Sequence, residues 1–102
     1  MRIPFGSGSA VLHEDFKDGL REIAGAMQAN NGLRLKLLAY AALQSETELF
    51  ARRLSLSRSL AVRNFLIAEG IEQTRITVQA LGPRGGEEPG AGEDRVDAFV
   101  VR

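Results

Sequence analysis

The stretch LRLKLLAYAALQSETELF, residues 33–50, is the most informative part of the sequence for the fold, because it joins a strand pattern to a helix start. In residues 33–39, leucine and alanine alternate with Arg34, Lys36 and Leu38, which is typical of a strand with one face covered by helices. Ser45-Glu46-Thr47-Glu48 has the Ser-x-x-Glu form of a capping box, in which two side chains bond the backbone N–H groups of the first helical turn. The stretch therefore predicts a strand followed closely by a helix that begins at residues 45–48.

The rest of the C-terminal half predicts two further strands. The helix is expected to run to Glu69, because Gly70-Ile71 has the form of a left-handed cap followed by an apolar residue. Residues 74–81 alternate again between apolar and polar side chains, which favours a strand. Residues 82–94 contain five glycines, two prolines and four acidic residues and predict a flexible loop. Residues 96–101 predict the closing strand.

The N-terminal third predicts a short strand and an amphipathic helix. Ile3 and Phe5 form an extended start, which Gly6-Ser7-Gly8-Ser9 interrupts. Apolar residues then recur at spacings of four, four, three and four, which places them in one stripe of a helix. Asn30-Asn31-Gly32 is expected to end this helix with residues that tolerate positive φ. The stripe consists of Leu12, Phe16, Leu20, Ile23 and Met27.

The predicted order of elements is β-α-β-α-β-β. Connections through helices favour parallel strands, and the last strand, which follows a loop without a helix, can run antiparallel. The fold class is therefore α+β, a two-layer sandwich with two helices on one face of a four-stranded mixed sheet. A chain of 102 residues forms one such domain, residues 1–102.

Composition excludes several classes of function. The 13 basic and 13 acidic residues give zero net charge, whereas nucleic-acid binders usually carry a basic excess, so no nucleic-acid partner is expected. The cysteine count is 0, which excludes disulfides and thiol catalysis. The longest apolar run, residues 37–43, is too short to cross a membrane. The single His13 beside Glu14 and Asp15 is more typical of a solvated first helical turn than of a metal site, and no enzyme activity, metal or cofactor is expected.

One residue of the second predicted helix does not fit its surroundings. Arg58 follows Leu54 by four residues and precedes Val62 by four, so it lies within an apolar stripe. The predicted stripe consists of Phe50, Leu54, Ala61, Val62 and Phe65. An unpaired buried guanidinium costs several kcal/mol. Three interpretations of Arg58 therefore remain open. Its side chain extends along the helix surface to water, it forms a structural ion pair with an acidic residue, or it binds an anionic ligand. The candidate ion-pair partners are Glu87, Glu88, Glu93, Asp94 and Asp97.

The residues around Arg58 resemble a known family. Residues 54–62, LSLSRSLAV, resemble the L-S-x-x-R-A-x-x-V signature of OmpA-like domains, the C-terminal peptidoglycan-binding modules of outer-membrane protein A, peptidoglycan-associated lipoprotein and the stator protein MotB. Residues 5–12 resemble the family's F-x-x-x-S-x-x-L opening, and residues 65–76 resemble its Y-L-x-x-x-G-I-x-x-x-R-I motif. Pro89 fits the family's loop proline, and residues 95–97 resemble the end of its R-R-V-E motif. The resemblance covers nearly the whole chain and implies the same β-α-β-α-β-β fold.

The resemblance implies a binding module that performs no chemistry. In the family, an aspartate in a G-x-T-D motif after the second strand and the helix arginine hold the charged end of diaminopimelate in the peptide stem of peptidoglycan. Arg58 matches the arginine, whose planar fork suits a carboxylate. The resemblance also implies a periplasmic location and a tether to the outer or inner membrane through an N-terminal part of a longer envelope protein.

The rest of the implied site departs from the family pattern. Tyr40-Ala41-Ala42-Leu43 stands at G-x-T-D, so Leu43, or Ala42 with a one-residue shift, replaces the aspartate. Ala51 replaces the asparagine that precedes Leu54-Ser55. Losing a charged contact to the ligand costs about 1.5–3 kcal/mol, or roughly ten- to a hundredfold in affinity. The candidate ligand-binding residues are Arg58, Tyr40, Ala42, Leu43, Ala51 and Leu54.

Two functions of an OmpA-like domain remain open at this point, beside an unrelated ligand- or RNA-binding sandwich, which the neutral charge and the single tyrosine argue against. The first is non-covalent binding of peptidoglycan through Arg58. The alternative is a degenerate OmpA-like domain that does not bind peptidoglycan and serves as an interaction or scaffold module for other envelope proteins. The apolar segment of residues 39–43 favours this alternative, because exposed apolar segments often mark contact surfaces.

Overall fold

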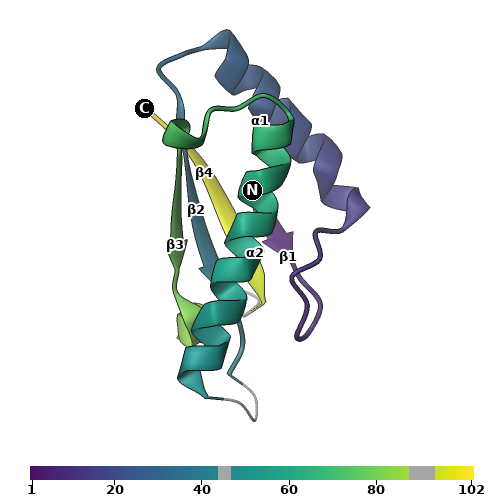
Figure 1. The fold of residues 1–102 in the computed structure, drawn as a ribbon, viewed down its shortest axis with the longest axis vertical. Helices are drawn as coiled ribbons and strands as arrows, with labels where there is room; N and C mark the ends of the chain where they lie inside the picture. Colours follow the sequence, from purple (N-terminus) through teal and green to yellow (C-terminus); the bar gives the residue numbers. More distant parts are fainter. Residues whose placement is uncertain (44–46, 88–93) are drawn as a thin grey trace.

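The computed structural model describes residues 1–43, 47–87 and 94–102. Two helices lie on one face of a four-stranded mixed sheet (Figure 1), so the predicted α+β sandwich is confirmed. The regular elements are β1 (Arg2–Pro4), α1 (Lys17–Ala29), β2 (Arg34–Tyr40), α2 (Glu48–Ala68), β3 (Ile76–Ala80) and β4 (Arg95–Val101), with short 3-10 helices η1 (Glu14–Phe16), η2 (Gln73–Arg75) and η3 (Gly82–Glu87).

The strand order is β1-β4-β2-β3. β2 and β3, joined through α2, pair in parallel, whereas β4 pairs antiparallel with both β1 and β2. β1 and β2 are therefore parallel to each other but separated by β4. The final strand thus enters the middle of the sheet, and the starts of β4 and the ends of β1 and β2 meet at one end of it.

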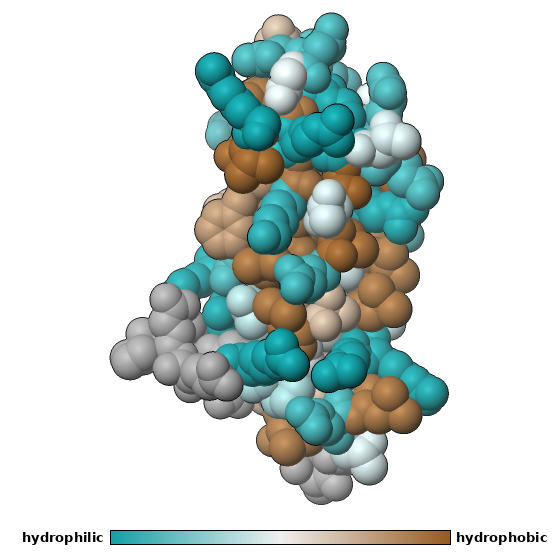
Figure 2. Space-filling view, turned by 90° about the vertical axis from the view of Figure 1, so that its left-hand side faces the viewer, coloured by the Kyte–Doolittle hydropathy of each residue, from teal (hydrophilic) through white to brown (hydrophobic). Residues whose placement is uncertain are grey.

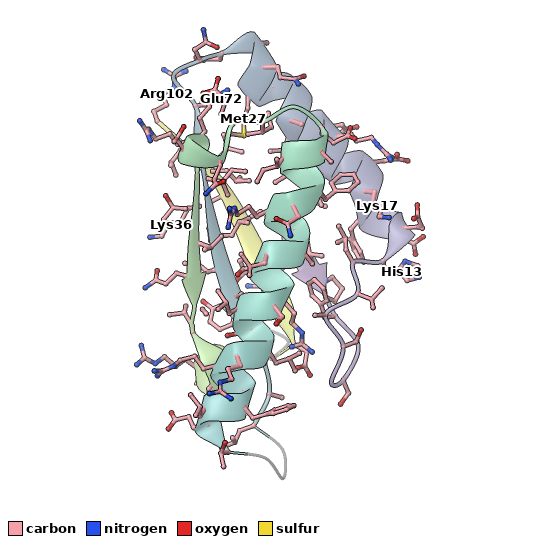
Figure 3. All side chains as sticks on the ribbon, in the orientation of Figure 1. His13, Lys17, Met27, Lys36, Glu72 and Arg102 are labelled. Atoms are coloured by element: carbon pink, nitrogen blue, oxygen red, sulfur yellow. The ribbon has the colours of Figure 1, made fainter. Side chains whose placement is uncertain are left out.

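The core lies between the sheet and the helices. The inward side chains of β2, Leu35, Leu37 and Ala39, are fully buried, and Arg34 and Lys36 on the opposite face are exposed, as the alternation predicts. Figure 3 shows Lys36 on the outer side, and Met27 points from α1 toward the sheet. The core cluster consists of Ile3, Phe5, Leu20, Ala24, Met27, Leu35, Leu37, Ala39, Val62, Leu66, Ile71, Ile76, Val96 and Ala98.

The first helix begins later and ends differently from the prediction. Its predicted apolar stripe faces the core: Leu20 and Met27 are fully buried, and Leu12, Phe16 and Ile23 are partly buried against the core cluster. The α-helix, however, begins at Lys17, after the 3-10 turn η1, which the His13 side chain caps by accepting from the Asp15 N–H. Asn30 ends the helix in an extended conformation (φ −139°) instead of a left-handed one. The Asn30 side chain accepts from the Gly32 N–H at 3.0 Å, so a local side-chain bond makes the turn without positive φ.

The second helix begins at Glu48 with Thr47 as its N-cap, and the Thr47 hydroxyl accepts from the Phe50 N–H at 3.3 Å. Ser45 and Glu46 of the predicted capping box lie outside the described residues. The helix ends as predicted, because Gly70 has φ +99° and the Ile71 N–H donates to the Leu66 carbonyl. This is the hydrogen bond of a left-handed glycine cap.

Substituting Gly70 tests this cap. We expect Gly70→Ala to lower the free energy of unfolding by about 1–2 kcal/mol, because alanine is strained at positive φ. Its Cβ would also lie 2.9 Å from Nε2 of Gln28, which donates to the Glu69 carbonyl. The matched variant is Gly25→Ala in α1, where an added Cβ meets nothing within 4 Å. This substitution should raise the free energy of unfolding by about 0.5–1 kcal/mol. Urea denaturation of both variants measures the difference, and equal effects of the same sign would contradict it.

Candidate functional site: a buried arginine at the strand ends

The face of α2 that packs on the sheet is more polar than the sequence pattern suggests. Its buried residues are Ala51, Ser55, Arg58, Ser59, Val62 and Leu66. The predicted apolar stripe is therefore wrong at Phe50, whose side chain is 48% exposed, and Leu54 is only half-buried. Small side chains replace large ones at this end of the helix.

Local hydrogen bonds make this polar burial possible. Ser55 Oγ donates to the Arg52 carbonyl at 2.7 Å and accepts from the Gly82 N–H at 3.1 Å. Ser59 Oγ donates to the Leu56 carbonyl at 2.8 Å. Buried hydroxyls that bond the preceding helical turn cost little, because their polar atoms remain satisfied. The short side chains let η3 pack directly on α2.

Arg58 is the largest fully buried side chain of the described residues, with 0% of its surface exposed. Its guanidinium reaches the end of the sheet where β1, β2 and β4 meet. The Phe5 ring lies on one side of it, 5.4 Å from the ring centroid to Cζ. A cation in this position needs both hydrogen-bond acceptors and a counter-charge.

The backbone supplies three of the acceptors. Nη2 donates to the Gly6 carbonyl at 2.9 Å and Nε to the Ser9 carbonyl at 2.7 Å, both in the loop after β1. Nη1 donates to the Tyr40 carbonyl at 3.0 Å, at the end of β2. The guanidinium thus connects α2 to the loop after β1 and to the end of β2, two segments that are far apart in sequence.

Asp94 supplies the charge. Its Oδ1 lies 2.8 Å from Nη1 of Arg58, and its side chain is 24% exposed. The same oxygen accepts from the Ala42 N–H at 3.0 Å. Of the three alternatives that the sequence left open, the structure therefore contains the internal ion pair, with one of the five acids named as candidates.

The other candidate acids are placed elsewhere or lie outside the description. Asp97 pairs with Arg95 at 3.1 Å on the opposite face of the sheet, where the guanidinium of Arg95 also lies 4.0 Å from the centroid of the Tyr40 ring. Glu88 and Glu93 lie outside the described residues, and the side chain of Glu87 is not described. The Tyr40 ring therefore contacts Arg95, whereas its carbonyl contacts Arg58.

The candidate residues from the sequence are only partly brought together. Arg58 donates to the Tyr40 carbonyl and to Asp94, and the Ala42 N–H donates to the same oxygen of Asp94. The Leu43 side chain is 51% exposed, and Ala51 is buried two turns before Arg58 on the same helix face. Sequence analysis missed the roles of Gly6 and Ser9, because a backbone carbonyl acceptor leaves no signal in residue identity.

A cleft of about 480 Å³ lies beside the loop that Arg58 holds. Arg58 is not among the residues that line it, but Gly6 and Ser9, whose carbonyls accept from Arg58, are. The lining residues are Pro4, Phe5, Gly6, Ser9, Val11, His13, Asp15 and Phe16. Among the helices of residues 1–43, 47–87 and 94–102, none has the length and apolar character that would cross a membrane.

Two helices on one face of a mixed sheet in the order β1-β4-β2-β3 place this chain in the class of α+β sandwich domains. Residues 4–96 match the sequence pattern of the OmpA family, and the chain belongs to that family. Among curated proteins, none matches the chain in sequence.

Several solved structures share the fold of this chain. The chain is 17% identical to the peptidoglycan-associated lipoprotein of Burkholderia pseudomallei, with a TM-score of 0.86 over 98% of this chain and 89% of that one. It is 20% identical to the OmpA-like domain of FopA1 from Francisella tularensis, with a TM-score of 0.83 over 98% of this chain and 69% of that one. The C-terminal domain of Helicobacter pylori MotB is 15% identical, with a TM-score of 0.80 over 100% and 84% of the two chains.

Proposed function

We propose that this chain is a non-catalytic domain of the bacterial cell envelope that serves as a scaffold or interaction module, with Arg58 in a structural role. It is a periplasmic domain of a longer protein whose N-terminal part tethers it to the outer or inner membrane. The single observation that carries the proposal is that Arg58 is fully buried and its guanidinium is bonded to Gly6, Ser9, Tyr40 and Asp94. An arginine with these internal partners has no exposed surface to offer a ligand.

The position of the family's aspartate supports the same proposal. Ala42 uses its backbone N–H to bind Asp94, and Leu43 projects an apolar side chain that is 51% exposed. Neither residue can pair with the ammonium group of a diaminopimelate ligand. Both halves of the ligand grip are therefore altered: the acid is replaced, and the arginine has an internal partner.

Exposed apolar side chains on α2 support a role in protein contacts. Leu49, Phe50 and Leu56 are 57%, 48% and 41% exposed. Leu49 and Leu56 are seven residues apart and therefore share one side of the helix. Figure 2, viewed from the side of β3, shows brown apolar surface among hydrophilic side chains along the middle of this side of the molecule. Of the apolar segment of residues 39–43, only the last residues add to the exposed apolar surface, because Ala39 and Ala41 are fully buried.

A second candidate function is peptidoglycan binding, which membership of the OmpA family favours. A pull-down with diaminopimelate-type sacculi distinguishes the two. We expect the purified domain to show no saturable retention that free meso-diaminopimelate competes away. Arg53→Ala, which removes an exposed arginine of the same helix, controls for non-specific charge attraction. Saturable, competed retention of the unaltered domain would overturn the scaffold proposal in favour of the anchor.

A further inference from the structure

We propose that the free edge of β3, together with the flank of α2 beside it, binds an extended acidic peptide of a partner protein as an additional strand of the sheet. The inference rests on the proposed function, an interaction module, and names the contact surface and the kind of partner. β3 is the last strand in the order β1-β4-β2-β3, so one of its two edges has no strand beside it among the described residues.

The backbone of β3 offers hydrogen-bonding groups along this edge. Directly after β3, the Leu81 N–H donates to the Ala39 carbonyl of β2 at 2.8 Å. Successive residues of a strand direct their backbone groups to opposite sides, so Gln79 shares the direction of Leu81 and faces β2. Val78 and Ala80 therefore direct their N–H and C=O groups to the open edge, where an added strand can bond to them.

The edge lacks the features that usually prevent strand addition. Edge strands are commonly blocked by a charged side chain, a proline or a bulge. Residues 76–80, ITVQA, contain no charged residue and no proline. They pair with residues 35–39 of β2 in an unbroken register, so no bulge turns the edge away. The strand is therefore a template of the kind that proteins use to bind extended peptides.

The flank of α2 beside this edge has an apolar surface. Phe65 of α2 faces α1, since Cζ of Arg21 lies 5.3 Å from the centroid of its ring. Ile67 follows two residues later, about 200° around the helix, and so lies on the side away from α1. This is the side of β3 (Figure 1), on which α2 packs. Leu56 lies in the same row three turns earlier and is 41% exposed, and Val78 in the middle of β3 is only half-buried.

Arginines without an internal counter-charge line the same flank. Arg63 stands one turn before Ile67, and its Nε is buried without a hydrogen-bond partner among the described residues. Arg52 lies at the end of β3, because a Cβ on Gly82 would be 3.4 Å from the Arg52 Cα. Arg84 follows in η3 and is exposed. Within residues 1–43, 47–87 and 94–102, none of these three arginines is in an ion pair.

These charges identify the kind of occupant. The planar fork of arginine suits a carboxylate, so acidic side chains at the ends of an added strand can pair with Arg52, Arg63 and Arg84. A second copy of this chain, paired edge to edge through β3, would bring the same arginines of both copies together, which is unfavourable because like charges repel. The surface therefore fits a partner segment with alternating apolar side chains and acidic ends.

The test is amide hydrogen exchange with a designed probe, acetyl-Glu-Glu-Val-Thr-Val-Thr-Val-Glu-Glu-amide. Without the probe, we expect the Val78 and Ala80 amides to exchange fast, whereas the Gln79 amide is already protected by β2. With the probe, exchange at Val78 and Ala80 should slow with saturation, by about tenfold when about nine-tenths of the domain is bound. The control peptide, with lysine in place of every glutamate, should give no protection.

Variants of the domain test the charge. Combined replacement of Arg52, Arg63 and Arg84 by alanine should weaken probe binding about tenfold, and the difference should shrink at high salt. Arg53→Ala is the matched control, because Arg53 is an exposed arginine of the same helix that points away from β3, and it should change the affinity less than about twofold.

Variants of the probe test strand addition. Methylation of alternate amide nitrogens, on the valines in one probe and on the threonines in another, should abolish binding in one of the two only. The reason is that only one edge of an added strand faces β3. Equal effects of the two methylated probes would overturn the inference.

Two further outcomes would also overturn it. One is equal protection by the acidic and the lysine probes, or none by either. The other is protection of Val78 and Ala80 that rises with the concentration of the domain alone, since a second copy would then occupy the edge. Failure here is distinct from failure of the proposed function. Sacculus retention by a domain whose edge still binds the probe contradicts only the role given to Arg58, and an edge that stays unprotected in a domain without sacculus retention contradicts only the strand site.

Discussion

Arg58→Leu is expected to lower the free energy of unfolding by about 3–5 kcal/mol, the range for removing one partner of a buried ion pair. Leucine fills much of the space but donates no hydrogen bond, so the carbonyls of Gly6, Ser9 and Tyr40 lose their donor together. Asp94 contributes less to the loss, because its side chain is 24% exposed and regains water. For a domain of this size, the loss corresponds to a fall in melting temperature of roughly 15 °C or more.

Two variants at arginine positions sharpen this experiment. Arg53→Leu alters an exposed arginine five residues earlier on α2 and should change the stability by less than about 0.5 kcal/mol. Arg58→Lys keeps the charge but lacks the planar fork that serves acceptors in three segments, so an intermediate loss is expected. Urea denaturation of all three variants measures the series. A loss at Arg58→Leu no larger than at Arg53→Leu would show that the network contributes nothing to folding.

Leu37→Ala is expected to cost about 3–4 kcal/mol, because it leaves a cavity in the middle of the core. The Leu37 side chain faces the helices and is fully buried, with 0% of its surface accessible to water. Its strand, β2, is paired on both sides. Its neighbour Leu38 lies on the opposite face and is half-buried. Leu38→Ala removes the same atoms and should cost only about 1 kcal/mol.

This pair of variants tests the register of β2. A shift of one residue would exchange the faces of the two leucines and reverse the order of their effects. Thermal and urea denaturation of both proteins under the same conditions provide the measurement. Equal losses, or a larger loss at Leu38, would contradict the register in which Leu37 lies opposite Ala98 and Val78.

Most of the fold could be predicted from local patterns. The alternation in residues 33–39 and the glycine cap at Gly70 each depend on neighbours within a few residues, and the structure confirms both. The start of the first helix was less predictable, because Leu12 and Phe16 have the four-residue spacing of an α-helix although the α-helix begins only at Lys17, after the 3-10 turn of residues 14–16. The left-handed ending predicted at residues 30–32 was wrong because Asn30 has a second way to make the turn.

The candidate site was only half predictable. The position of Arg58 among apolar residues indicated a buried charge with a special partner, and Asp94 was one of five acids that could have been that partner. To choose the correct acid among the five, one must know where β4 begins relative to the end of β2. That placement follows from the insertion of β4 between β1 and β2, a contact between residues more than fifty positions apart.

The order of the helices and strands, the covered face of the sheet and the anomalous arginine can be read from the sequence, because each of these depends on periodicity or on a residue out of pattern. What the arginine binds depends on the tertiary structure. Its acceptors are the carbonyls of Gly6, Ser9 and Tyr40 and the carboxylate of Asp94, which chain folding brings to one end of the sheet. Backbone acceptors are present at every residue, so their use is set by position in space and not by residue type.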